Sequence, residues 1–225
     1  MTAAPRQPVV ATQPELSFAV TGAAAIEYAA VPTVGFTLEV AAENAVAVQA
    51  ISLNAQVRIA PAGRSYDPVS QARLVELFGA PDRWATNLHG FLWAHSTLHI
   101  GPFTAQTVVT LPVACTYDFE VAVAKYFNGV QDGQIPLEFL FSGNVFYRGA
   151  DGMLQTCRLS WEKEATYQFP VQVWREMMDH YFPDTAWIRF GKAQFDRLYA
   201  YRCTHSLLSW DDAIDALLRS AEPER

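Results

Sequence analysis

Three histidines are the residues best suited to metal chemistry in this sequence: His89, His95 and His99. If residues 91–100 form a strand, His95 and His99 share a face and lie about 13 Å apart at roughly 3.3 Å per residue. Two imidazoles at that separation cannot chelate one ion without a bend in the strand. On a helix the i, i+4 spacing would suit zinc, but the glutamate of a zincin motif is absent. We therefore assign no metal site and expect exposed or core histidines.

The cysteines and serines supply no catalytic set. Cys115, Cys157 and Cys203 are widely spaced and form no CxxC pair, which is typical of small buried hydrophobes in a reducing compartment. Residues 141–143 read Phe-Ser-Gly and lack the glycine two residues before the serine that a nucleophile elbow uses. Gly143 instead indicates a bulge or a close backbone approach. We assign no catalytic residue and no cofactor.

A lysine and several glutamates have the composition of a polar ligand site. Lys125 interrupts the apolar face of a strand predicted over residues 117–127. An inward lysine needs a carboxylate partner because an unpaired buried charge is very costly, and Glu138, Glu162 or Glu164 could supply it. An ion pair at the rim is one interpretation, and a site for a polar ligand or a partner's main chain is the other. The residues of this candidate polar site are Tyr117, Lys125, Glu162 and Glu164.

Aromatic side chains are abundant and suggest a surface for a partner protein. They make up 13% of the chain, and such side chains dominate both cores and interfaces. Trp84, Phe91 and Trp93 lie where a helical insertion joins the predicted sheet. We expect these three residues to form an exposed hydrophobic docking patch.

The elements that position these residues are mainly strands. Residues 34–40 and 51–59 alternate apolar and other side chains with a period of two, which is the strand signal. Further strands are predicted over residues 91–100, 104–111, 117–127, 135–148, 153–161 and 166–169. Asn128-Gly129 and Asp132-Gly133 are turn dipeptides, so the strand after them is expected to return antiparallel.

Helices are predicted in one insertion and at the end of the chain. Asp67 is a good N-cap, and Pro68 suits the first helical position of an insertion at about residues 65–89. Helical periodicity returns at about residues 170–221, where Ser209 and Asp212 form a capping pair. The fold class is therefore α+β and mainly β: an antiparallel β-sandwich or curved sheet with a helical insertion and a C-terminal helical layer. We expect one domain over residues 15–225 after a disordered leader, residues 1–14.

Charge and hydropathy exclude several function classes. The formal net charge is −7, so binding to nucleic acid or to an anionic membrane surface is not expected. No apolar run approaches the roughly 18 residues of a membrane-spanning helix, and the first residues lack a signal-peptide core. With an odd number of unpaired cysteines, these features predict a cytoplasmic, soluble protein.

Several stretches resemble the bacterial domain-of-unknown-function family 6084. The matching stretches include Tyr28–Thr33, Leu77–Trp84, Leu111–Tyr126, Trp161–Ala165 and Val173–Asp179. The resemblance carries no assigned activity or catalytic residues. Members are often encoded near nickel–iron hydrogenases, which implies an accessory protein whose partners are hydrogenase subunits or maturation factors.

A second resemblance concerns the order of elements. Antiparallel strands, Phe169-Pro-Val, a helix and a further helix are similar to the layout of SecB-type export chaperones, which bind unfolded chains on apolar grooves. The favoured function is a non-enzymatic accessory or interaction protein. The alternatives are a SecB-like chaperone and a metal- or small-ligand-binding enzyme with a dispersed site. The sequence leaves the oligomeric state open.

Overall fold

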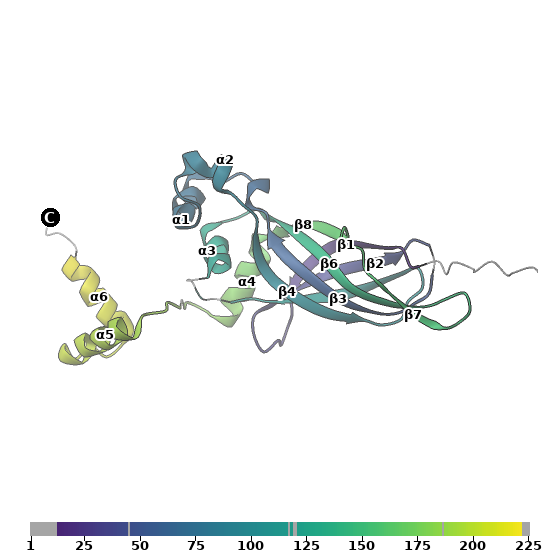
Figure 1. Ribbon diagram of the computed structural model, residues 1–225. Coiled ribbons are helices and arrows are strands. Elements are labelled where there is room, and N and C mark those ends of the chain that lie inside the picture. Colours follow the sequence, from purple (N-terminus) through teal and green to yellow (C-terminus); the bar gives the residue numbers. More distant parts are fainter. Residues whose placement is uncertain (1–12, 45, 117, 119–120, 186, 222–225) are drawn as a thin grey trace, which may run out of the picture. The chain divides into compact units, whose positions relative to one another are not determined.

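The computed structural model describes residues 13–44, 46–116, 118, 121–185 and 187–221 (Figure 1). They form two compact units, the first ending at residue 185 and the second comprising residue 118 and residues 187–221. Residues 15–225, expected as one domain, are divided between these units. Residues 1–12 of the expected leader lie outside the described residues. No described helix has the length and apolar character needed to cross a membrane.

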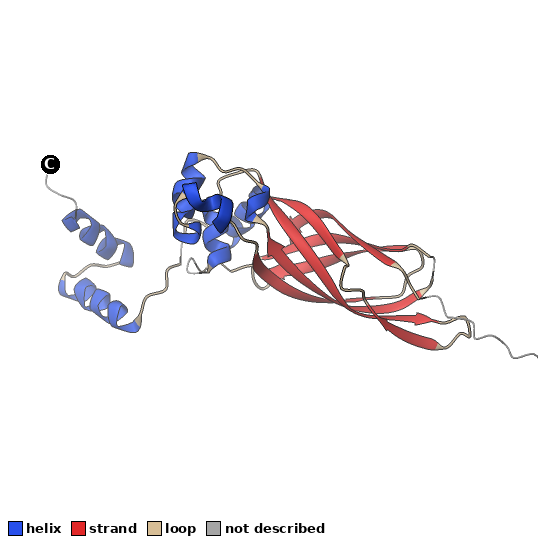
Figure 2. Cartoon of the chain, turned by 45° about the horizontal axis from the view of Figure 1, so that its top comes forward, coloured by secondary structure: helices blue, strands red, loops and turns tan. Residues whose placement is uncertain are grey.

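Two antiparallel sheets make up most of the first unit (Figure 2). The three-stranded sheet has the order β1 (Leu16–Ala25), β2 (Thr33–Ala42), β5 (Gln106–Ala114). The five-stranded sheet has the order β4 (Phe91–Ile100), β3 (Val48–Ile59), β6 (Gln134–Arg148), β7 (Leu154–Arg158), and β8 (Glu164–Pro170) also pairs with β6. The predicted α+β, mainly β class is confirmed.

The inner faces of the two sheets share one core. The alternation predicted for residues 34–40 and 51–59 is confirmed, because every second residue is a buried apolar one in both strands. These residues are Val34, Phe36, Leu38 and Val40 on β2, and Ile51, Leu53, Ala55, Val57 and Ile59 on β3. Phe36 of β2 meets Phe139 of β6 with ring centroids 5.1 Å apart. Phe18 of β1 stacks on Phe141 of β6 at 4.6 Å. Aromatic contacts of this kind hold the sheets face to face.

Four helices and two 3₁₀ turns gather at one end of the strands (Figures 1 and 2). They are η1 (Pro61–Gly63), α1 (Pro68–Phe78), η2 (Pro81–Arg83), α2 (Trp84–Asn87), α3 (Ala122–Gly129) and α4 (Val171–Tyr181). Asp67 caps α1 as predicted, since its Oδ1 accepts from the amides of Val69 at 2.9 Å and Ser70 at 3.0 Å. Gly79 then ends α1 at a φ of 75°.

The strand predicted over residues 117–127 is wrong for most of its length. The chain forms helix α3 from Ala122, while Tyr117 lies outside the described residues. Val123, Ala124, Tyr126 and Phe127 are buried, which is the spacing of one helical face. The same apolar residues satisfied a period of two along part of the segment, so periodicity alone could not separate the alternatives.

A chain of two hydroxyls ties α3 to the start of the insertion. Tyr66 donates its hydroxyl proton to the Pro61 carbonyl at 2.7 Å. Its oxygen also lies 2.7 Å from the Tyr126 hydroxyl. Because Tyr66 has a single hydroxyl proton, Tyr126 must be the donor of this second bond. Burial raises the pKa of the Tyr126 phenol above its usual value, so the donor stays protonated.

The second unit is a pair of helices, α5 (Lys192–Thr204) and α6 (Trp210–Ala221). The capping pair predicted before α6 is confirmed. The Asp212 amide donates to Ser209 Oγ, and the Ser209 amide donates to Asp212 Oδ2, both at 3.0 Å. The predicted C-terminal helices over residues 170–221 thus appear as α4 in the first unit and as α5 and α6 in the second.

We expect Tyr66→Phe to lower the free energy of unfolding more than Tyr126→Phe does. The first change leaves the Tyr126 hydroxyl and the Pro61 carbonyl without this partner, at a cost of about 1–3 kcal/mol. The second leaves Tyr66 bonded to Pro61 and costs about 0.5–1.5 kcal/mol. Urea denaturation at pH 7 measures both. A larger loss for Tyr126→Phe would contradict the donor order.

Gly143 should tolerate no side chain. It has a φ of 147°, and an added Cβ would lie 2.0 Å from the Ser52 carbonyl oxygen on β3. We expect Gly143→Ala to cost more than about 3 kcal/mol of unfolding free energy. Gly152→Ala is the matched control, because Gly152 also has a positive φ, 77°, but no atom lies within 4 Å of its added Cβ. The control should cost only about 1–2 kcal/mol; equal losses in thermal or urea denaturation would rule out the clash.

Candidate functional site

Of the three aromatics expected in an exposed docking patch, Trp84 belongs to the core, and Phe91 and Trp93 are partly buried against it. Trp84 is only 6% exposed, and its indole N–H donates to the Gly79 carbonyl at 2.9 Å. Phe91 is half-buried and meets the Tyr126 ring at 5.6 Å between centroids. The expected exposure is therefore wrong for Trp84. The physical reason is that these rings pack in the space between the helices and the sheet, which buries them at least in part.

Trp93 packs in the same space. Val57 of β3 pairs with Ala94 and Arg58 pairs with Leu92, so Trp93 is the extra residue of a β-bulge on β4. Its half-buried ring packs on Phe127 of α3, with centroids 4.9 Å apart. The bulge thereby aims the indole at the helices. The sequence showed the tryptophan but gave no sign of the bulge that directs it.

Lys125 of the candidate polar site has a carboxylate partner that the sequence did not indicate. Lys125 lies on α3, and its Nζ forms an ion pair with Glu76 of α1. Glu76 is therefore the carboxylate partner of Lys125, the role for which the sequence offered Glu138, Glu162 or Glu164. Glu162 lies in the turn before β8, Glu164 begins that strand, and both are exposed. The fourth residue, Tyr117, lies outside the described residues.

The groups considered for metal or nucleophilic chemistry are dispersed. Within the described ranges, no group of three or more His, Cys, Asp or Glu side chains could hold a metal ion. His95 and His99 lie exposed on β4, as the strand interpretation required. Burial raises the pKa of the Cys115 thiol to about 12, which keeps it protonated. Cys203, in contrast, is exposed on α5.

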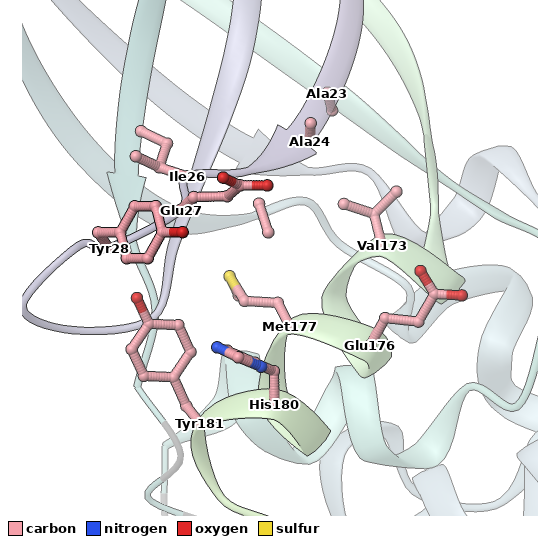
Figure 3. A pocket seen from close by; sticks show the side chains of 11 residues that line it. Ala23, Ala24, Ile26, Glu27, Tyr28, Val173, Glu176, Met177, His180 and Tyr181 are labelled. Atoms are coloured by element: carbon pink, nitrogen blue, oxygen red, sulfur yellow. The ribbon is translucent and has the colours of Figure 1, made fainter.

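A groove between β1 and α4 is a concave site of the first unit (Figure 3). Its volume is about 500 Å³, within the usual range for ligand sites. One wall is the end of β1 and the residues after it, Ala23 to Tyr28. The other wall is one face of α4. The α4 residues on that face are Val173, Glu176, Met177, His180 and Tyr181.

The β1 wall is an open strand edge. β1 pairs with β2 on one side and is the outer strand of its sheet. The Ile26 amide donates to the Thr33 carbonyl at 2.8 Å, so positions 26 and 24 bond toward β2. Because the bonds of an antiparallel ladder alternate, the N–H and C=O of Ala23 and Ala25 face away from β2. β8 also lies beside β1, but it pairs with β6 and forms no ladder with β1, so in the described residues these backbone groups have no strand partner.

Small side chains make room along this edge. Ala23, Ala24 and Ala25 follow one another on β1, and Val173 and Met177 lie one helical turn apart on α4. Met177 is buried and Val173 half-buried, so the floor between the walls is apolar. An apolar floor beside open backbone groups can hold a side chain and its main chain together.

The rim of the groove is acidic. Glu27 lies on the β1 side and Glu176 on the α4 side, and both are exposed (Figure 3). No lysine or arginine is among the described residues that line it. The rim therefore attracts a positively charged group.

A tyrosine fixes the loop that closes one end of the groove. The Tyr181 hydroxyl of α4 donates to the Ala29 carbonyl at 2.8 Å, which joins the helix to the loop after β1. Tyr28 in that loop has a φ of 58° and is 99% exposed. A non-glycine residue in this conformation carries backbone strain, which is common beside binding sites. The alanine run and the spacing of Val173, Met177 and Tyr181 were the sequence signals for this groove, but an open edge is not visible in sequence.

Solved structures resemble this chain only distantly. The CARDB domain of a Pyrococcus furiosus protein, solved in complex with di-metal ions, is 13% identical, with a TM-score of 0.29 and coverage of 75% of this chain and 98% of that one. A Kluyveromyces marxianus β-glucosidase is 14% identical, with a TM-score of 0.25 and coverage of 69% of this chain and 15% of that one. Such low scores carry no argument about function.

Sequence comparison places the chain in a family. No curated protein matches it. A model for a family of unknown function, DUF6084, matches residues 13–225, which include every strand and helix described above. The chain belongs to the DUF6084 family, as its sequence resemblance indicated.

Proposed function

We propose that this protein is a non-enzymatic accessory protein that binds an extended segment of a partner protein in the groove between β1 and α4. The observation that carries the proposal is the open edge of β1 facing the apolar wall of α4. Strand addition beside a helix is a recurring way to bind peptides, because main-chain bonds supply affinity and side-chain pockets supply selectivity.

The groove favours a partner segment of defined chemistry. The outward N–H and C=O groups of Ala23 and Ala25 would pair with the main chain of the segment. An aliphatic side chain would enter the floor between Val173 and Met177. A lysine or arginine next to it would lie near Glu27 or Glu176, whose carboxylates favour a cation. The expected motif is thus a short apolar stretch with an adjoining basic residue.

The proposed partners are nickel–iron hydrogenase subunits or their maturation factors. This link comes from the sequence resemblance and the gene neighbourhood that it implies. The shape and lining of the groove favour a protein partner but do not identify which protein it is. No cofactor is required for such a role, and the cytoplasmic location expected from the sequence suits it.

A chaperone function is the second candidate, and the apolar floor of the groove favours it. A SecB-like chaperone binds unfolded chains with little regard to sequence. The acidic rim argues for selection of basic segments instead. The two functions therefore differ in how many different segments occupy the groove.

We expect a photo-crosslinking amino acid at Val173 to capture specific partner segments in the native host. Gln172 is the control position, because it is exposed on the same helix but does not line the groove. Mass spectrometry of the cross-linked peptides should identify extended apolar segments with an adjoining lysine or arginine. Glu176→Lys should lower the yield roughly tenfold, since it reverses a rim charge. Asp179→Lys makes the same change on α4 outside the groove lining and should have no effect.

The pattern of cross-links decides between the candidates. Equal yields from Val173 and Gln172 would overturn the groove as a binding site. Cross-links spread over many unrelated unfolded chains, unaffected by Glu176→Lys, would favour the chaperone. Hydrogenase subunits or maturation factors among the specific partners would support the accessory role.

Proline substitutions test the strand edge directly. Ala25→Pro removes an N–H that faces away from β2, so we expect the protein to stay folded and to lose cross-linking at Val173. Ala24→Pro removes an N–H that bonds to β2 and should cost about 1–3 kcal/mol of unfolding free energy. Thermal denaturation measures the difference. Equal destabilisation by both changes would show that Ala25 is not on the open edge.

A further inference from the structure

The second unit has almost no interior of its own. In its described part, residue 118 and residues 187–221, only Ala213 is buried. Large apolar side chains on its surface are between 38% and 94% exposed. We name six of them the apolar face: Ile188, Phe190, Phe195, Ile214, Leu217 and Leu218. Two isolated helices cannot bury such a surface by themselves.

Apolar residues form a stripe along α6, and most of this stripe does not pack against α5. Trp210, Ala213, Ile214, Leu217 and Leu218 recur at the spacing of a core-facing helix. Trp210 meets Phe195 of α5 with ring centroids 5.5 Å apart, so the first turn of α6 packs on its neighbour. Ala213 is buried, whereas Ile214, Leu217 and Leu218 remain exposed.

A hollow lies beside the open part of the stripe. It measures about 520 Å³, and its lining combines members of the apolar face, among them Ile188, Phe195 and Ile214, with the basic residues Arg189 and Lys192. A hollow of this size accepts several aliphatic side chains. The second unit therefore offers both protruding leucines on α6 and a place for such leucines.

The charges of the two helices are opposite. α5 carries three bases and one acid, which are Lys192, Arg197, Arg202 and Asp196. α6 carries three acids and one base, which are Asp211, Asp212, Asp215 and Arg219. A two-fold interface places each surface against a copy of itself, so it requires complementary parts within one surface. A helix pair with one basic and one acidic member meets that requirement.

We propose that the second unit is a self-association surface and that its partner is a second copy of this chain. Two helix pairs related by a two-fold axis form a four-helix arrangement, with α5 of one copy against α6 of the other. The protruding Leu217 and Leu218 of each copy enter the hollow of its partner. This packing buries the apolar face, which is the condition that four-helix bundles satisfy. The proposal is independent of the groove on the first unit.

Sedimentation equilibrium of the full chain tests the proposal without any other protein. We expect the wild type to have twice its 25.0 kDa chain mass at micromolar concentrations. The double variant Ile214→Lys with Leu218→Lys should raise the dimer dissociation constant roughly tenfold or more for each side chain changed. Circular dichroism should show unchanged helix content, since lysine is a good helix former.

Leu154→Lys is the matched control. Leu154 of β7 is 62% exposed and Leu218 is 60% exposed. Both changes therefore replace a similarly exposed leucine by lysine, but on different units. The control should leave the dimer intact. A wild-type monomer at about 100 μM, or a dimer that survives the double variant, would overturn the proposal. Equal weakening by Leu154→Lys would do so as well.

Discussion

The close approach of β6 to β3 is the constraint on which the rest of the first unit depends. β3 pairs with β4 on one side and with β6 on the other, so it is a central strand. Gly143 lies opposite Leu53, against the Ser52 carbonyl oxygen, where any side chain would collide. A slip by one residue would bring a β-carbon to that oxygen and turn the buried face of β3 outward. One glycine therefore fixes which apolar side chains form the core.

With the sheets in register, their open end must be filled, and aromatic rings fill it. Trp93, aimed by a bulge, and Phe91 reach from β4 toward Tyr126 and Phe127 of α3. The helices therefore pack where the strands leave apolar surface uncovered, rather than across a sheet face. α4 then ends up beside β1, because it follows directly from β8. The groove is a consequence of this connection as much as of its own lining residues.

The parts of the fold that sequence could predict are those set by local chemistry. Alternation identified β2 and β3, and Asp67 marked the first turn of α1, because these signals lie within a few residues of each other. The helix at Ala122 was missed because its apolar residues fit two periods, and only packing on α1 decides between them. The candidate aromatics were assigned to the surface for a similar reason. Composition identifies a tryptophan suited to an interface, but burial depends on distant segments.

An open strand edge is normally a hazard, since it can pair with any other extended chain. Three features restrict the edge of β1. A register shift between Val20 and Gly22 breaks its regularity, α4 narrows access to its last residues, and Glu27 and Glu176 repel acidic segments. Under the proposed function, these three features would together limit strand addition to a short segment with apolar and basic side chains. Restriction of this kind has little value for an edge that binds nothing, whereas it is what a selective peptide site requires.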